Sequence, residues 1–298
     1  MLILGALYAS VSRLPAESTA EFKRVLALAP SDHIVLDVAV VKGDVTITYK
    51  HAGEIAVSAV AHANDGTDLP ANFFDDFLQV ERIGSHVKIQ TNSGNARSSR
   101  AIRFSYTIEV PNWIEVNSSV QEGRQVVAGV MGPVRVMSDR GDIRVSYVTT
   151  SLVARTGNGS IDINHVGASA KVETGSGNIE IKDVGPASVA TVKQGTGRIE
   201  TDGVRGSFTG STDAGELELT GGVFDDWDLT SGSGNIRMGI AAESKFDLDV
   251  TTASGSLFVE NASIESEVED NRRECHQKVN GGGKHVRAHS NAGNIFIQ

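Results

Sequence analysis

One short motif, Thr-Gly-x-Gly-x-Ile-x-Ile, recurs through the second half of this 298-residue chain and constrains its fold more than any other feature. Its clearest copies begin at Thr156 and Thr174, where they read TGNGSIDI and TGSGNIEI. The second glycine recurs every 18 to 21 residues, apart from one gap of 38 before the last copy. A fixed period near 19 is the signature of a solenoid, in which each unit buries its apolar face against its neighbours. The second glycines are Gly123, Gly141, Gly159, Gly177, Gly197, Gly215, Gly234, Gly255 and Gly293.

Apolar residues alternate within each unit, which is the period of a strand and not of a helix. The motif itself carries one strand, with inward residues such as Ile161 and Ile163. A second strand precedes it, with inward residues two and four positions before the Thr or Ser. Two strands and two glycine-containing turns form one rung, so the sequence predicts an all-β solenoid (β-helix) of short 18–21-residue rungs. The inward pairs of the second strand are Val134/Val136, Leu152/Ala154, Ala170/Val172, Ala190/Val192, Phe208/Gly210, Trp227/Leu229, Leu248/Val250 and Val286/Ala288.

The regularity changes along the chain and divides it into three segments. Residues 122–298 carry the regular rungs, interrupted by a charged insertion at 260–284 that we expect to be a loop with a helical turn. Residues 21–121 alternate irregularly, and we expect them to form capping strands that cover one end of the solenoid. Residues 1–20 begin with a short apolar run that lacks a basic n-region. This run fits either a truncated secretory signal or an ordinary N-terminal tail.

Charge and cysteine content exclude several classes of protein. The net charge of −10 argues against nucleic-acid binding, which requires a basic face. No stretch approaches 18 apolar residues, so no transmembrane segment is expected. The single cysteine, Cys275, excludes an internal disulfide and fits either a reducing compartment or an envelope protein without bridges. The favoured location is the periplasm or the cell surface, with the cytoplasm as the alternative.

Three features together resemble the bacterial putative-adhesin β-solenoid family, a domain of unknown function. They are the repeated TGxGxIxI motif, the Tyr-x-Ile-x-Val-Pro strand at 106–111 and the Gly-Asp-Val-Thr-Ile opening at 43–47. The resemblance covers roughly residues 30–298 and implies a β-solenoid fold. Members of that family occur in cytoplasmic and envelope-associated proteins, some of them linked to envelope stress. The family has no accepted catalytic residues, so the resemblance transfers no site to this chain.

The outward position between the two inward residues of the motif strand forms a ladder, which is the main candidate interaction strip. Four consecutive members are acidic, and carboxylates about 5 Å apart in water repel by roughly 0.8 kcal/mol per adjacent pair. A solvated face tolerates this cost, and that is the first interpretation. The alternatives are a cation site or a docking strip for a basic partner. In the expected order, the ladder consists of Arg144, Asp162, Glu180, Glu200, Glu218, Arg237, Phe258 and Phe296.

Two phenylalanines end this ladder. Phe258 and Phe296 become neighbours if the insertion between them loops out of the stack. Their side chains then point outward, and they either lie beneath the insertion or form an exposed contact patch. Burial beneath the insertion is favoured.

The sequence contains no recognisable catalytic, cofactor-binding or metal-binding motif, and no cofactor is expected. The leading hypothesis is a non-enzymatic structural or binding module, adhesin-like and associated with the bacterial envelope, whose partner is a protein or a glycan. A second hypothesis is a carbohydrate-active β-helix that uses the acidic residues of the ladder, because carboxylates near 5 Å apart suit a retaining glycosidase. A third hypothesis is an intracellular regulatory scaffold that docks a protein partner.

Overall fold

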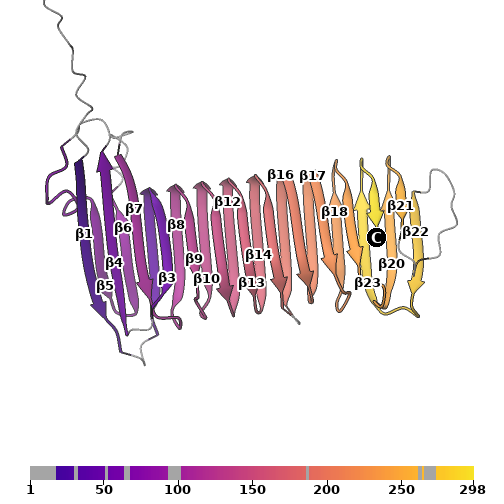
Figure 1. Ribbon diagram of the computed structural model, residues 1–298, viewed down its shortest axis with the longest axis horizontal. Helices are drawn as coiled ribbons and strands as arrows, with labels where there is room; N and C mark the ends of the chain where they lie inside the picture. Colours follow the sequence, from indigo (N-terminus) through magenta and orange to yellow (C-terminus); the bar gives the residue numbers. More distant parts are fainter. Residues whose placement is uncertain are drawn as a thin grey trace, which may run out of the picture.

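The computed structural model describes residues 18–29, 33–50, 53–63, 68–92, 102–185, 188–260, 264 and 273–298. Over these residues the chain forms 24 β-strands and no helix. The described part therefore contains no helix long and apolar enough to cross a membrane. The strands build an elongated rod in which a typical rung contributes one strand to each of two layers (Figure 1). The predicted all-β solenoid of short rungs is confirmed.

The first layer, here named the motif layer, contains the strands that carry the repeated motif. Its neighbouring strands run parallel, except at the N-terminal edge, where β4 pairs antiparallel with both β1 and β7. In spatial order the layer consists of β1 (Ser18–Ala27), β4 (Glu54–Ala63), β7 (Ile102–Val110), β3 (Asp44–Tyr49), β9 (Gln125–Ala128), β11 (Ile143–Val148), β13 (Ile161–Val166), β15 (Ile179–Val184), the second halves of β16 (Val189–Val204) and β17 (Ser207–Gly221), β19 (Ile236–Ile240), β24 (Ile295–Ile297) and β21 (Leu257–Val259).

The second layer, here named the opposite layer, contains the strand that precedes each motif. It is parallel in its interior, with one antiparallel strand at each end, β5 and β22. In spatial order it consists of β5 (Leu78–Ile83), β6 (His86–Thr91), β2 (Val35–Lys42), β8 (Glu115–Glu122), β10 (Val134–Arg140), β12 (Ser151–Asn158), β14 (Ser169–Ser176), the first halves of β16 and β17, β18 (Trp227–Ser231), β23 (Lys284–Ser290), β20 (Phe246–Thr252) and β22 (Glu274–Val279).

The core lies between the two layers and consists of the inward residues that the alternation predicts. Each predicted pair of the second strand is buried, from Val134 and Val136 to Val286 and Ala288. Trp227 and Phe208 are the largest side chains of the central core, and each is at most 1% exposed. At the N-terminal end, Phe77 stacks on Phe104 at 4.9 Å between ring centroids. The rod is therefore filled by aliphatic rungs, and aromatic rings pack together near its N-terminal end.

The rungs do not stack in the order of the sequence. The rung of β23 and β24, which ends the chain, lies between the rung of β18 and β19 and the rung of β20 and β21. The same occurs near the N-terminus, where β2 lies between β6 and β8. Figure 1 accordingly places the C-terminus inside the stack and not at its tip. The sequence predicted that Phe258 precedes Phe296 in the outer ladder, and this order is wrong.

Two expectations concern the ends of the chain. Part of the charged insertion, expected to be a loop with a helical turn, is a strand: β22 pairs antiparallel with β20, with Cys275 opposite Val250. Alternation places Cys275 and Val279 inward, which explains why this part of the insertion joins the sheet. The suggested N-terminal signal or tail falls on residues that lie almost entirely outside the described part of the chain, which begins at Ser18.

Candidate functional site

The repeated motif forms one corner of the rod, where each strand of the opposite layer turns into a strand of the motif layer. The threonine of the motif is buried there and holds the rungs together. Thr156 Oγ1 donates a hydrogen bond to the carbonyl oxygen of Gly141 at 2.9 Å, and Thr174 Oγ1 donates to Gly159 at 3.0 Å. The hydroxyl therefore satisfies the carbonyl of the second glycine one rung earlier.

The second glycine is required because the backbones of successive rungs approach closely at this corner. A Cβ atom at Gly177 would lie 2.2 Å from the carbonyl oxygen of Gly159, and the φ of Gly177 is +131°. Both facts exclude residues with side chains. The residue after this glycine bonds to the next rung: the Asn178 side chain accepts a hydrogen bond from the backbone N–H of Arg198 at 3.1 Å. The motif is thus explained by the contacts between rungs.

A groove of about 620 Å³ runs along the same corner, parallel to the long axis, and is here named the axial groove. One side carries the outward residues of five successive strands, which occupy equivalent positions in the register. Along the groove, the next outward position is glycine in the three central rungs and aspartate in the rung at each end. The first set is Met137, Arg155, Glu173, Lys193 and Ser211, and the second set is Asp139, Gly157, Gly175, Gly195 and Asp213.

The charges of the axial groove are only partly paired. Arg155 Nη2 donates to Glu173 Oε1 at 3.1 Å, and Lys171 Nζ lies 3.5 Å from the same oxygen. Lys193, Asp139 and Asp213 form no ion pair with any residue in the described part of the chain. The groove therefore offers one unpaired cation in the fourth of its five rungs and one unpaired carboxylate at each end. This arrangement can form ion pairs with a ligand at three points.

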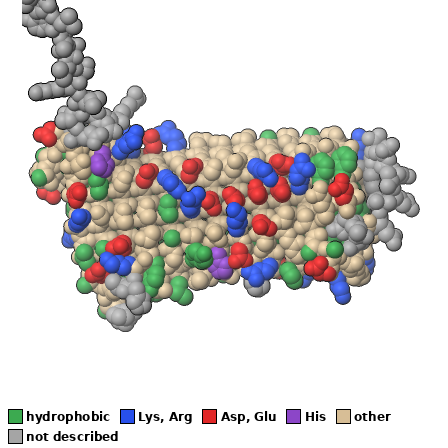
Figure 2. Space-filling view, viewed as in Figure 1, with side chains coloured by type: hydrophobic (Ala, Val, Ile, Leu, Met, Phe, Trp, Pro, Cys, Tyr) green, Lys and Arg blue, Asp and Glu red, His purple; other side chains and the backbone are tan. Residues whose placement is uncertain are grey.

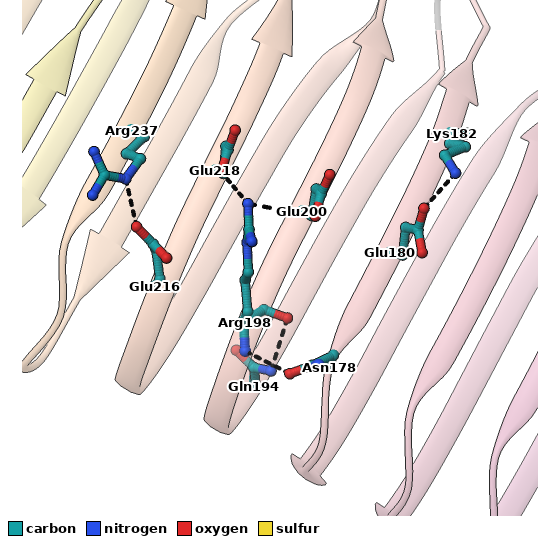
Figure 3. A network of polar contacts seen from close by, with 9 residues as sticks. All are labelled: Asn178, Glu180, Lys182, Gln194, Arg198, Glu200, Glu216, Glu218 and Arg237. Carbon is teal, nitrogen blue, oxygen red and sulfur yellow. Dashed lines mark hydrogen bonds and ion pairs between the residues drawn. The ribbon is translucent and has the colours of Figure 1, made fainter.

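The predicted outer ladder lies on the exposed face of the motif layer, and its acidic residues are paired with cations (Figure 3). Arg144 Nε lies 2.9 Å from Asp162 Oδ2. Glu180 contacts Lys182, and Arg198 contacts both Glu218 and Glu200.

Lys182 donates a hydrogen bond to Glu180, which raises the pKa of Lys182, and Arg198 donates one to Glu218, which raises the pKa of Arg198. The four carboxylates of the ladder therefore form a mixed ion-pair network and not a bare acidic stripe. A general acid needs a carboxyl group held protonated, usually by burial in a cleft. An exposed sheet face with adjacent cations does not provide that environment.

Phe258 and Phe296 are brought together as predicted, but Phe258 is not buried. Their rings are 4.9 Å apart with 9° between the planes, and Phe258 is 45% exposed. The expected burial beneath the insertion is therefore wrong for Phe258, while Phe296 is half-buried between its neighbours. The Arg237 guanidinium carbon lies 4.4 Å from the centroid of the Phe296 ring, which is a cation–π contact. The ladder thus ends in a row of one arginine and two phenylalanines.

The cysteine and the histidines near the C-terminus lie on different faces of their strands. Cys275 is buried, whereas His276 Nδ1 lies 3.0 Å from the exposed Asp249. His289 Nδ1 contacts Thr251 at 2.9 Å. Among the residues that the structure describes, no group of three or more His, Cys, Asp or Glu side chains is arranged to hold a metal ion.

Comparison with known families identifies the fold: the chain belongs to the Toastrack DUF4097 family, whose model matches residues 31–298. A search of curated proteins finds no match. Solved structures match with low sequence identity. One is a putative adhesin from Bacteroides fragilis, with 11% identity, coverage of 93% of this chain and 97% of that chain, and a TM-score of 0.47. Another is a putative lipid binding protein from Parabacteroides distasonis, with 11% identity, coverage of 93% and 96%, and a TM-score of 0.41.

The axial groove was not predicted from the sequence, although a signal for it exists. The first glycine of the motif is present at Gly157, Gly175 and Gly195 and is replaced by Asp139 and Asp213 in the flanking rungs. The three successive glycine copies, bounded by one aspartate copy on each side, mark where the groove begins and ends. Finding the groove also requires knowing that Lys193 lies beside that glycine row, which depends on the register between rungs.

Proposed function

We propose that this protein is a non-enzymatic binding module that holds an extended polypeptide segment of a partner along the axial groove. The observation that carries this proposal is the continuity of the groove across five rungs. Rungs stack about 4.8 Å apart, so five rungs offer roughly 20 Å of contact. That length accommodates about six residues of extended chain. The proposal refines the adhesin-like role predicted from the sequence.

The glycine row supports a polypeptide ligand. Gly157, Gly175 and Gly195 present no side chains, which allows a backbone to approach closely. The backbone groups of these strands already pair with the neighbouring rungs, so a ligand would be held by close packing against the glycine row and by side-chain contacts. The residues that line the groove include no aromatic side chain, and sugar rings usually stack on aromatic faces. A polypeptide therefore fits the groove better than a glycan does.

The unpaired charges define which peptide would fit best. Lys193, one rung from the Asp213 end, attracts a carboxylate, and Asp139 and Asp213 at the two ends attract cations. A segment with a basic residue near each end and an acidic residue between them is complementary to this pattern. Such charges contribute mainly to specificity and to the association rate.

The test is a selection from an unbiased displayed library of short peptides. We expect the selected peptides to bind the wild-type protein and to lose at least tenfold in affinity with Lys193→Glu or Asp213→Lys. The matched control is Glu200→Lys, a charge reversal on the outer ladder, which should leave affinity unchanged. Peptides that are insensitive to both groove variants, or a selection that yields no binder, would contradict the proposal.

The outer ladder is a second candidate surface because its aromatic end is exposed. Phe258, stacked on Phe296, is accessible over 45% of its surface. Exposed aromatic and arginine side chains are the residues most enriched at the centres of protein interfaces. If Phe258→Ser abolishes binding of the selected peptides while Lys193→Glu does not, this end of the ladder is the binding site.

We also propose an extracytoplasmic location, in the periplasm or at the cell surface. The support is the apolar run at the start of the sequence. Cell fractionation with N-terminal sequencing of the mature protein tests this proposal. Cleavage near Ala16 with recovery from the envelope is the expected result. An intact Met1 in the cytosol would favour the intracellular scaffold instead.

A further inference from the structure

Large hydrophobic side chains are exposed along one edge of the rod, opposite the axial groove. At this edge each strand of the motif layer turns into the next strand of the opposite layer. Of the nine large hydrophobic residues that are exposed in the described part of the chain, seven lie at this edge, here named the tip edge. They are Tyr49, Ile83, Trp113, Met131, Tyr147, Val189 and Phe224, with exposed fractions from 36% to 66%.

The tip edge runs along most of the rod. Ile83 ends the β5 strand at the N-terminal end, and Phe224 precedes β18 near the other end. About nine stacked rungs separate these two positions, which corresponds to roughly 40 Å. Figure 2 shows hydrophobic side chains distributed along the lower edge of the rod, interspersed with charged ones. The exposed apolar side chains, here called tips, therefore form a row of separate groups and not one compact patch.

Tyr147 adopts a backbone conformation that its side chain makes unfavourable. Its φ is +56°, while Gly129 in the preceding rung has a φ of +74° at the equivalent position. A non-glycine residue in the left-handed region lowers the folding equilibrium constant by about tenfold or more. Glycine would avoid this cost, and the tyrosine instead projects a ring that is 61% exposed. His165 and Asp183 adopt the same conformation at the equivalent positions of the next two rungs, so the turn itself requires it.

Several charged groups between the tips form ion pairs or hydrogen-bonded pairs. Asp183 lies 2.6 Å from both His165 and Arg205. Lys284 and Asp225 form a second pair at 2.8 Å near Phe224. Hydrogen bonding from Lys284 lowers the pKa of Asp225, so this pair stays charged near neutral pH. Paired charges are less costly to bring near an apolar phase than single ones.

Lys50 and Glu109 form a third pair, at 2.8 Å beside Tyr49. The hydrogen bond that Lys50 donates to Glu109 raises the pKa of Lys50. No excess of basic residues accompanies the tips, and the chain as a whole carries a net charge of −10. Attraction to anionic lipids, which depends on clusters of Lys and Arg, is therefore not a feature of this edge.

We propose that the tip edge rests on the surface of a phospholipid bilayer with zwitterionic headgroups, with the rod axis parallel to the membrane. A straight file of apolar tips matches a flat, fluid surface, because each tip inserts independently and needs no complementary pocket. A protein partner would need a matched depression for each of seven tips over roughly 40 Å. Trp and Tyr are also the side chains that favour the membrane–water interface.

The orientation leaves the axial groove accessible. The groove occupies the corner at which the opposite layer turns into the motif layer, and the tip edge occupies the other corner. A rod that lies on its tip edge therefore presents the groove away from the lipid. The membrane proposal does not depend on the peptide-binding proposal, and either can fail without the other.

Trp113 provides a direct probe, because the chain has two tryptophans and the other is buried. Trp113 is 36% exposed at the tip edge, whereas Trp227 is 0% exposed in the core. We expect phosphatidylcholine vesicles to shift the emission of Trp113 to shorter wavelength and brominated lipids in those vesicles to quench it. The protein should also float with the vesicles in a density gradient. Unchanged emission together with no flotation would overturn the proposal.

Edge variants distinguish the tip edge from the rest of the surface. Phe224→Ser and Tyr147→Ser should each reduce partitioning into phosphatidylcholine vesicles by about tenfold. Phe258→Ser removes an exposed phenylalanine from the face of the motif layer and serves as the matched control, with no expected effect. Circular dichroism verifies that each variant is folded. Vesicle binding that depends on Phe258 and not on the edge residues, or that requires anionic lipid, would overturn the proposal.

Discussion

The ring of Phe296 stacks on the ring of Phe258 at 4.9 Å, although strands β22 and β23 lie between these two residues in the sequence. The contact exists because the last rung of the sequence enters the stack between two earlier rungs. Strands β18 and β20 consequently each pair with β23 and do not pair with each other. The C-terminal end of the rod can therefore be completed only after the whole chain is available.

The interior position of the last rung makes the final residues essential for stability. Ile295 is fully buried between β19 and β21, so Ile295→Ala should lower the free energy of unfolding by about 2–5 kcal/mol. Ile83→Ala, at a site that is 54% exposed, is the matched control and should change it by less than about 0.5 kcal/mol. Chemical denaturation measures both. Similar values for the two variants would show that the last rung does not lie inside the stack.

Because successive backbones approach closely at the glycine corner, adding one methyl group there should lower the stability of the protein substantially. Gly177→Ala should destabilise the protein by about 3 kcal/mol or more, since it combines overpacking of roughly 1–3 kcal/mol with backbone strain of similar size. Gly84 also has a positive φ, +61°, but a Cβ there would have no atom within 4 Å. Gly84→Ala should therefore show the strain alone, about 1–3 kcal/mol. Thermal unfolding of both variants separates the two contributions.

The buried hydroxyls of the corner differ in a testable way. Thr174 Oγ1 bonds to Gly159, whereas Thr212 Oγ1 has no hydrogen-bond partner in the described part of the protein. Thr174→Val should cost about 1–3 kcal/mol, because it leaves a buried carbonyl unsatisfied. Thr212→Val should be neutral or stabilising, because it removes an unpaired polar atom. Equal effects in denaturant titrations would count against the assigned hydrogen bond.

Stability should depend on acid pH through Asp183. The hydrogen bond from His165 lowers the pKa of this carboxyl, and Arg205 acts in the same direction. A group with a lowered folded-state pKa contributes stability above its unfolded pKa of about 3.9 and loses it as pH falls through the folded value. Asp183→Asn, which tolerates the same left-handed backbone, should therefore be less stable than wild type near neutral pH. The difference should vanish in strong acid.

Arg205→Gln removes one cation from the same carboxylate and should reduce this pH dependence in part. Denaturant titrations between pH 2 and pH 7 are the measurement. A constant difference between wild type and Asp183→Asn over this whole range would show that the carboxylate is not stabilised by its neighbours.

The ion-pair network of the outer ladder should contribute little and should be sensitive to salt. Arg198→Gln leaves Glu200 and Glu218 adjacent without their shared cation. Since these groups are largely exposed, the expected loss is about 1 kcal/mol or less at low ionic strength, and it should decrease further in 1 M salt. Unfolding at both salt concentrations tests this. A loss that is large and independent of salt would contradict the ion-pair explanation.

The sequence alone predicted much of the fold because the repeat is local. Ile161, Ile163 and their equivalents alternate with polar residues at a period that only strands satisfy, and the second glycine marks each turn. These patterns depend on residues within one rung, so no knowledge of distant contacts is needed. The outer ladder was predicted for the same reason, since parallel rungs in register place Asp162 beside Glu180.

The tertiary structure alone decided the order of the rungs, the cations that neutralise the ladder, and the two long surfaces. The order depends on which edge a strand pairs with, and β23 offers the same apolar alternation to several edges. Arg198 reaches Glu218 from the corner within β16, so its partner depends on side-chain direction. The axial groove and the tip edge arise from residues such as Lys193 and Tyr147, which become neighbours of other rungs only after stacking. A repeat specifies its unit through local periodicity, whereas its surfaces are created by contacts between units.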